Sequence, residues 1–170
     1  QIVYGPISDM VGRKPPLYAG LVLFLIGSVG CSLSSDIETL IFFRFVQGIG
    51  ASSVMVIPRA IIRDLHTGVE ATRLMSLVML VLSVSPILAP LVGSALIVPF
   101  GWRAVFVAVT IVSALAFVLT AISLPETRPP EERIKISLAE AMGGFSQLLR
   151  HGRFLGLTFI GGFGMASYLG

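Results

Sequence analysis

The chain alternates between long apolar runs and short polar segments. A helix that crosses a membrane needs about 20 mainly apolar residues. Four runs meet or approach that length, over residues 16–33, 37–62, 74–98 and 104–124. Shorter apolar sequence flanks them at residues 1–4 and 154–170. The pattern predicts an all-α polytopic membrane protein with four complete and two partial transmembrane helices.

Composition agrees with this interpretation. Hydrophobic residues make up 55% of the chain, charged residues 12%, and the mean hydropathy is +0.93, values that exclude an ordinary soluble domain. The single cysteine, Cys31, lies inside an apolar run and can form no internal disulfide. Because the chain begins with Gln and shows no signal peptide, we expect it to be a fragment of a longer protein.

Basic residues indicate the orientation, since Lys and Arg concentrate in cytoplasmic loops. Only Arg103 lies in one set of alternate loops, and the other set carries Arg13, Lys14, Arg59, Arg63, Arg73, Arg128, Arg133, Lys135, Arg150 and Arg153. We therefore expect the segment around Asp9 and residues 128–150 to be cytoplasmic, in a cell inner (plasma) membrane. The asymmetry accounts for the net charge of +3, so the lipid bilayer is the expected partner and nucleic acid is not.

The polar segment between the first two apolar stretches carries the first motif. Its spacing is G-x-x-x-D-x-x-G-R-K-x-x-L, and the residues are Gly5, Asp9, Gly12, Arg13, Lys14 and Leu17. It resembles the loop between the second and third helices of the major facilitator superfamily. That resemblance implies a secondary transporter of twelve helices that works by alternating access. It also implies a gating role for this loop, in which Asp9 engages the other half of the protein and Arg13 pairs with an acid at the end of the fourth helix. Asp64 is the residue that fits.

The resemblance covers nearly the whole chain and predicts its organisation. Residues 1–127 would be most of the N-terminal six-helix half, from the end of the second helix to the sixth. Residues 128–150 would be the central cytoplasmic linker, and residues 151–170 the start of the seventh helix. The rest of the C-terminal half would be the missing partner.

Arg44 is the second candidate, because it lies about six residues into a span, roughly 9 Å along a helix. Arginine near a bilayer centre costs on the order of 3 kcal/mol and usually faces a cavity or a partner; the alternative is that it snorkels to the interface. Helical spacing places Arg44, Gln47, Gly48 and Ala51 on one face. The segment resembles the fourth-helix signature of proton-coupled facilitators, which implies that Arg44 and Gln47 shape a proton or substrate site.

The third candidate lies in the next span, where Ser85, Ala89 and Gly93 recur every four residues and Pro86 and Pro90 interrupt the backbone donors. Such a pattern predicts a kinked helix with a groove for close packing. It resembles the antiporter signature of drug:proton exporters of the Bcr/CflA type, in which Pro90 and Gly93 are the strict matches. Pro86, Ala89, Pro90 and Gly93 would form this antiporter helix.

The resemblance implies a proton-coupled antiporter for small amphipathic or cationic compounds, as in multidrug efflux, with the proton gradient as its energy source and no cofactor. Two alternatives stay open: a proton-coupled metabolite symporter of the same fold, and a membrane scaffold without transport. His66 and His151 lack neighbours at metal-ligand spacing, so no metal site is expected. No nucleophile elbow or paired carboxylates occur within a span, so an enzyme is not expected.

Overall fold

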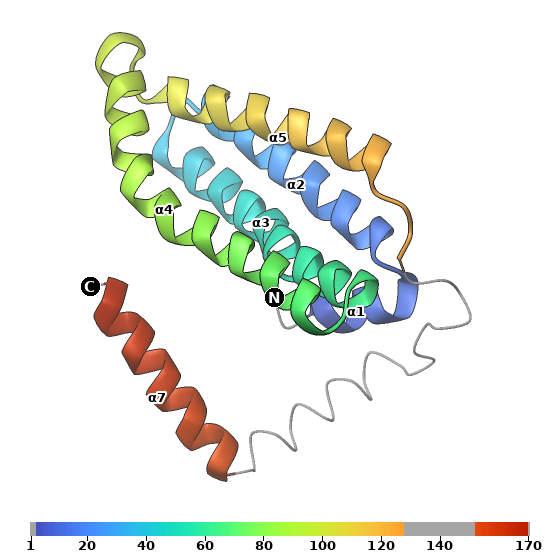
Figure 1. The fold of residues 1–170 in the computed structure, drawn as a ribbon. Coiled ribbons are helices and arrows are strands. Elements are labelled where there is room, and N and C mark those ends of the chain that lie inside the picture. Colours follow the sequence, from blue (N-terminus) through green and yellow to red (C-terminus); the bar gives the residue numbers. More distant parts are fainter. Residues whose placement is uncertain (1–2, 128–151, 170) are drawn as a thin grey trace. The chain divides into compact units, whose positions relative to one another are not determined.

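The computed structural model describes residues 3–127 and 152–169, and all its regular elements in these ranges are helices (Figure 1). They are α1 (Tyr4–Val11), α2 (Lys14–Leu33), α3 (Ile37–Leu65), α4 (Gly68–Phe100), α5 (Arg103–Ser123) and α7 (Gly152–Leu169). Within the described ranges, α2, α3, α4 and α5 are long and apolar enough to cross a membrane. The predicted all-helical membrane fold with four complete spans is confirmed.

The chain divides into two compact units, residues 1–133 and 134–170. The first unit holds α1 to α5. In the second, α7 carries a short apolar stretch, Phe154–Phe163. The expected linker, residues 128–150, lies outside the described residues.

Helices α2 and α3 form the most intimate contact of the first unit. Leu17 and Leu21 of α2 pack on Ile57 and Ile61 of α3 in a buried cluster. Further toward the Leu33 end of α2, the backbones of the two helices approach each other through glycines. A Cβ atom built on Gly27 would lie 2.6 Å from the amide nitrogen of Gln47.

The same close approach is repeated along the two helices. Gly20 lies against Ser53, Gly30 lies against Phe43, and Gly50 lies against the backbone of Gly20 and Phe24. Small residues are what permits such contact between membrane helices. Helix α5 covers another side of α2, where the rings of Tyr18 and Phe117 are 5.6 Å apart.

Helix α4 is different, because none of its residues is buried. It runs as one unbroken helix through Pro86, Pro90 and Pro99 and is visibly curved in Figure 1. The predicted close packing is absent from the part of the chain that the structure describes: Pro86, Ala89 and Pro90 are exposed, and nothing lies within 4 Å of a Cβ built on Gly93. Among the described residues, Ala89 and Gly93 border a cavity, and the predicted packing of this groove against another helix stays a prediction.

The connection between α1 and α2 corrects the predicted charged loop. Gly5 and Asp9 lie within α1, Lys14 begins α2, and only Gly12 and Arg13 separate the two helices. Gly12 has φ +108°, a backbone angle that other residues adopt only with strain. The segment can therefore turn sharply within two residues.

Two further loops are equally tight. Asp36 caps α3, since its carboxylate accepts a hydrogen bond of 2.8 Å from the amide of Thr39. That bond lowers the pKa of Asp36 below its ordinary value. Gly101, with φ +79°, ends α4.

The glycine contacts make a testable prediction. Gly50→Ala should lower the stability of the full-length protein by about 1–3 kcal/mol, because the new methyl group meets backbone atoms of α2 that cannot rotate away. Thermal unfolding in detergent would measure the change.

Gly48→Ala is the matched control, two residues away on the same helix. A Cβ on Gly48 has nothing within 4 Å, so stability should stay the same or rise. Equal losses in the two variants would contradict the proposed importance of the α2–α3 approach.

Candidate functional site

Arg44 begins a chain of hydrogen bonds that runs from a cavity into the α2–α3 contact. Its Nη1 donates to Oε1 of Gln47 at 2.7 Å, and Nε2 of Gln47 donates to the hydroxyl of Ser28 at 2.7 Å. That hydroxyl donates to the carbonyl of Phe24 at 2.7 Å. Gln47 is only 4% exposed, and both polar ends of its amide have partners. The chain fixes Gln47 firmly and leaves Arg44 at its open end.

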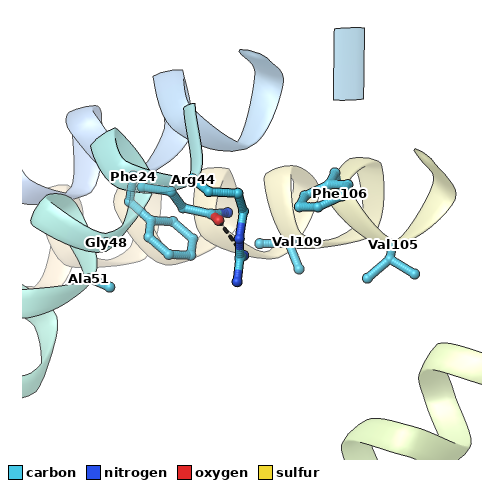
Figure 2. A pocket seen from close by; sticks show the side chains of 8 residues that line it. Phe24, Arg44, Gly48, Ala51, Val105, Phe106 and Val109 are labelled. Carbon is cyan, nitrogen blue, oxygen red and sulfur yellow. Dashed lines mark hydrogen bonds between the residues drawn. The ribbon is translucent and has the colours of Figure 1, made fainter. Parts of the chain in front are cut away.

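The cavity in front of Arg44 has a volume of about 570 Å³. Figure 2 shows Arg44 between Phe24 of α2 and Phe106 of α5. Its lining residues come from three helices: Phe24, Arg44, Gln47, Gly48, Ala51, Val105, Phe106 and Val109. The four α3 residues that helical spacing places on one face all line it.

The direction of the Arg44 side chain bears on the snorkelling alternative. Its partner Gln47 lies one turn further from the Ile37 end of α3, so the guanidinium is held away from the nearest helix end. Its Cζ atom also lies 5.8 Å from the centre of the Phe106 ring. Both contacts direct the charge toward the cavity.

A second cavity of about 630 Å³ shares Phe24, Ala51, Val105 and Val109 with the first. Its lining is almost wholly apolar, and α4 contributes Ala89, Val92, Gly93 and Leu96. Among the described lining residues of the two cavities, Arg44 is the single charged group. Together the two cavities offer apolar space beside one cationic group, Arg44, which can donate hydrogen bonds.

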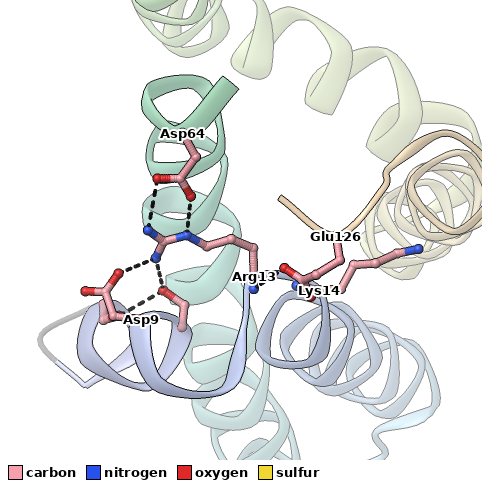
Figure 3. Close-up of polar contacts among 7 residues, drawn as sticks. Asp9, Arg13, Lys14, Asp64 and Glu126 are labelled. Carbon is pink, nitrogen blue, oxygen red and sulfur yellow. Dashed lines mark hydrogen bonds and ion pairs between the residues drawn. The ribbon is translucent and has the colours of Figure 1, made fainter. Parts of the chain in front are cut away.

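A network of charged groups lies at one end of the first unit (Figure 3). We name this the Arg13 end and define it by Arg13, Asp64 and Glu126. Arg13 binds Asp64 through two bonds, Nε to Oδ2 at 2.7 Å and Nη2 to Oδ1 at 3.3 Å. Its Nη1 contacts Oδ1 of Asp9 at 2.7 Å and donates to the hydroxyl of Ser8 at 2.7 Å. One guanidinium thus connects α1 with α3.

Arg13 is deeply buried for a charged residue, with 5% of its surface exposed. Burial alone would lower the pKa of its guanidinium, but the hydrogen bond to Asp64 and the charges of Asp9 and Asp64 outweigh burial and raise that pKa. The group therefore stays charged. A charge this buried is tolerable because two carboxylates and a hydroxyl bind the guanidinium.

The structure brings together some of the expected gating residues and not others. Asp9, Arg13 and Asp64 meet, and Gly12 supplies the turn that aims Arg13. Gly5 makes no close helix contact and takes part through its carbonyl, which accepts from Ser8 at 2.8 Å. The ammonium of Lys14 lies 5.7 Å from the centre of the Tyr18 ring, away from Asp64.

Ser28 and Glu126 are functional candidates that the sequence patterns did not predict. The carboxylate of Glu126 accepts hydrogen bonds from the backbone amides of Arg13 at 2.8 Å and Lys14 at 3.2 Å (Figure 3). A polar serine beside Gly27 within an apolar run was the available signal for Ser28. The signal for Glu126 was weaker. Glu126 is a carboxylate shortly after an apolar span, and that span ends beside the N-terminus of α2.

The four helices long and apolar enough to cross a membrane, with a cavity lined by three of them, identify a polytopic helical membrane protein. The chain belongs to the Major Facilitator Superfamily, whose pattern matches residues 1–170. The predicted family is confirmed, and it is a family of transporters and not of enzymes.

The relatives of the chain include a bacterial MFS-type transporter and bacterial proteins named for drug resistance. It is 39% identical to an uncharacterized MFS-type transporter, YdgK, of Bacillus subtilis (strain 168), over 96% of this chain and 41% of the relative. It is 33% identical to Multidrug resistance protein D of Escherichia coli (strain K12), over 99% and 42%. A bicyclomycin resistance protein homolog of Haemophilus influenzae is 29% identical, over 96% and 41%. The chain thus spans about two fifths of the length of these relatives.

The Arg13 network predicts unequal effects of removing its members. In the full-length protein, Arg13→Gln should cost about 3 kcal/mol, because it leaves Asp9 and Asp64 without the cation between them. Asp64→Asn should cost about 1 kcal/mol, since the amide still accepts a hydrogen bond. Thermal unfolding would measure both, with Arg63→Gln, an exposed arginine on the last turn of α3, as the control.

Exchanging the two charges, Arg13→Asp with Asp64→Arg, should restore part of the loss. Full recovery is not expected, because Asp9 would then face a second carboxylate at position 13. A double variant as unstable as the sum of the two single charge reversals would contradict a direct pairing.

Proposed function

We propose that the full-length protein is a proton-coupled antiporter that exports small amphipathic compounds by alternating access. The observation that carries this proposal is the Arg44–Gln47–Ser28 chain, which brings one cationic group to two adjoining and mainly apolar cavities. Relatives named for multidrug and bicyclomycin resistance support efflux of small molecules. The apolar space would hold the hydrophobic body of the compound, and Arg44 would bind an acceptor group.

Arg44 would couple transport to protons without releasing one itself, since a guanidinium stays charged at any working pH. When Arg44 contacts a carboxylate, it lowers the pKa of that group and favours release of its proton. When the two separate, the carboxylate takes up a proton again. The described cavity residues include no carboxylate, so this group would belong to another part of the full-length protein.

The Arg13 end would face the cytoplasm of a bacterial cell, in agreement with the positive-inside rule. There the Asp9–Arg13–Asp64 network would act as a gate that favours one of two states of the transporter. Residues 1–127 would then be most of the N-terminal half, residues 128–150 the cytoplasmic linker, and residues 151–170 the start of the C-terminal half.

The charge on Arg44 is the first quantity to test. In full-length protein reconstituted in proteoliposomes, Arg44→Gln should slow substrate-driven proton flux at least about tenfold, since a charge-assisted hydrogen bond is lost. Arg44→Lys should recover part of it. Bicyclomycin, which carries hydrogen-bond acceptors, is the probe, and a pH-sensitive dye inside the vesicles is the readout.

Arg63→Gln is the matched control, because it removes the same charge from an exposed position of the same helix. Its flux should equal that of the unmodified protein. Coupled flux at the normal rate in Arg44→Ala would contradict the proposed role of Arg44.

Variants of two α4 residues can distinguish an antiporter from a symporter of the same fold. Pro90 and Gly93 would keep α4 open toward the apolar cavity, so we expect Pro90→Ala and Gly93→Ala to raise the proton leak without substrate while leaving stability unchanged. Comparing coupled with uncoupled proton flux tests this. Unaltered coupling in both variants would favour the symporter alternative.

A further inference from the structure

The N-terminus of α2 has its backbone donors satisfied in an unusual way. A helix leaves its first four amides without partners inside the helix. In α2, Pro15 and Pro16 occupy two of these positions and have no amide hydrogen to satisfy. The next amide, that of Leu17, already donates to the carbonyl of Arg13 at 3.4 Å. The amide of Lys14 and that of Arg13 just before it both donate to Glu126. One carboxylate from beyond α5 therefore completes this helix end.

A charge from α5 also meets the opposite end of α2. Arg103, the first residue of α5, donates from Nη2 to the carbonyl of Ser34 at 2.7 Å, and Ser34 is the residue that ends α2. An anion at a helix N-terminus and a cation at its C-terminus both complement the helix dipole. Residues at the two ends of α5 thus fasten α2 at both of its ends.

We propose that Glu126 is a positioning residue for Arg13. The carboxylate holds the backbone of Arg13, while Asp9 and Asp64 hold its guanidinium. With its backbone fixed, Arg13 can reach both carboxylates from a single rotamer. This inference rests on the proposed gate and adds a specific link: Glu126 follows α5 by three residues, so displacing the end of α5 from α2 loosens Arg13.

Hydrogen exchange of the full-length protein in lipid nanodiscs tests the contact directly. The two prolines contribute no amide, so a peptide covering residues 12–17 reports mainly on Arg13, Lys14 and Leu17. Glu126→Ala should speed exchange of the Arg13 and Lys14 amides about tenfold, the effect of losing a hydrogen bond to a charged group. Glu126→Gln, which keeps one carbonyl acceptor, should give a smaller increase and decides the question if the alanine variant does not fold.

Arg103→Gln is the matched control, because it removes a charge that α5 supplies to the other end of α2. It should leave exchange at residues 12–17 unchanged. Unchanged exchange in the Glu126 variants would overturn the proposal, as would an equal increase in the control.

A double-mutant cycle separates positioning from simple capping. Capping would stabilise α2 whether or not Asp64 is present, whereas positioning acts through the Arg13–Asp64 pair. We expect Glu126→Ala to lower the midpoint of thermal unfolding less in an Asp64→Asn background than in the unmodified protein. Additive effects would overturn the positioning role. Neither measurement needs a substrate, so its outcome is independent of whether the protein proves to be an antiporter.

Discussion

The close approach of α2 and α3 is the constraint on which the other features depend. Without side chains at Gly20, Gly27, Gly30 and Gly50, the two backbones come near enough for Ser28 to reach Gln47. That bond orients the amide of Gln47, and the amide in turn holds Arg44 at the cavity. The same contact also contains the buried cluster of Leu17, Leu21, Ile57 and Ile61, on the side of the Arg13 end. Both polar sites of the first unit are therefore built on one glycine-lined interface.

The two arginines differ in how their charge is balanced. Arg13 has two carboxylates and a hydroxyl, and it is buried, so its charge is neutralised locally. Arg44 has an amide and an aromatic ring as its described partners, and these orient the guanidinium without cancelling its charge. A neutralised charge suits a contact that holds helices together. An uncancelled charge facing a cavity suits the binding of an acceptor or an anion.

Hydrophobic run length was enough to predict the four spans, because the length of an apolar segment is a local property. Helical spacing also placed Arg44 and Gln47 on the cavity face. Spacing could not show that Gly50, and not Gly48, meets the backbone of a neighbouring helix. The role of Glu126 depends on a contact between distant residues, since Arg13 and Glu126 are 113 positions apart. Such contacts leave almost no trace in one sequence.

Helix α4 contributes a wall to the apolar cavity and yet has no buried residue within the unit. Replacing a side chain at Ala89 or Val92 would change the shape of that wall while breaking few contacts that stabilise the fold. The α2–α3 interface has the opposite character, since each of its glycines is tied to the backbone or side chain of a facing residue. In the proposed transporter, substitutions in α4 would therefore change which compounds fit the apolar cavity, while the glycine-lined pair keeps the scaffold constant.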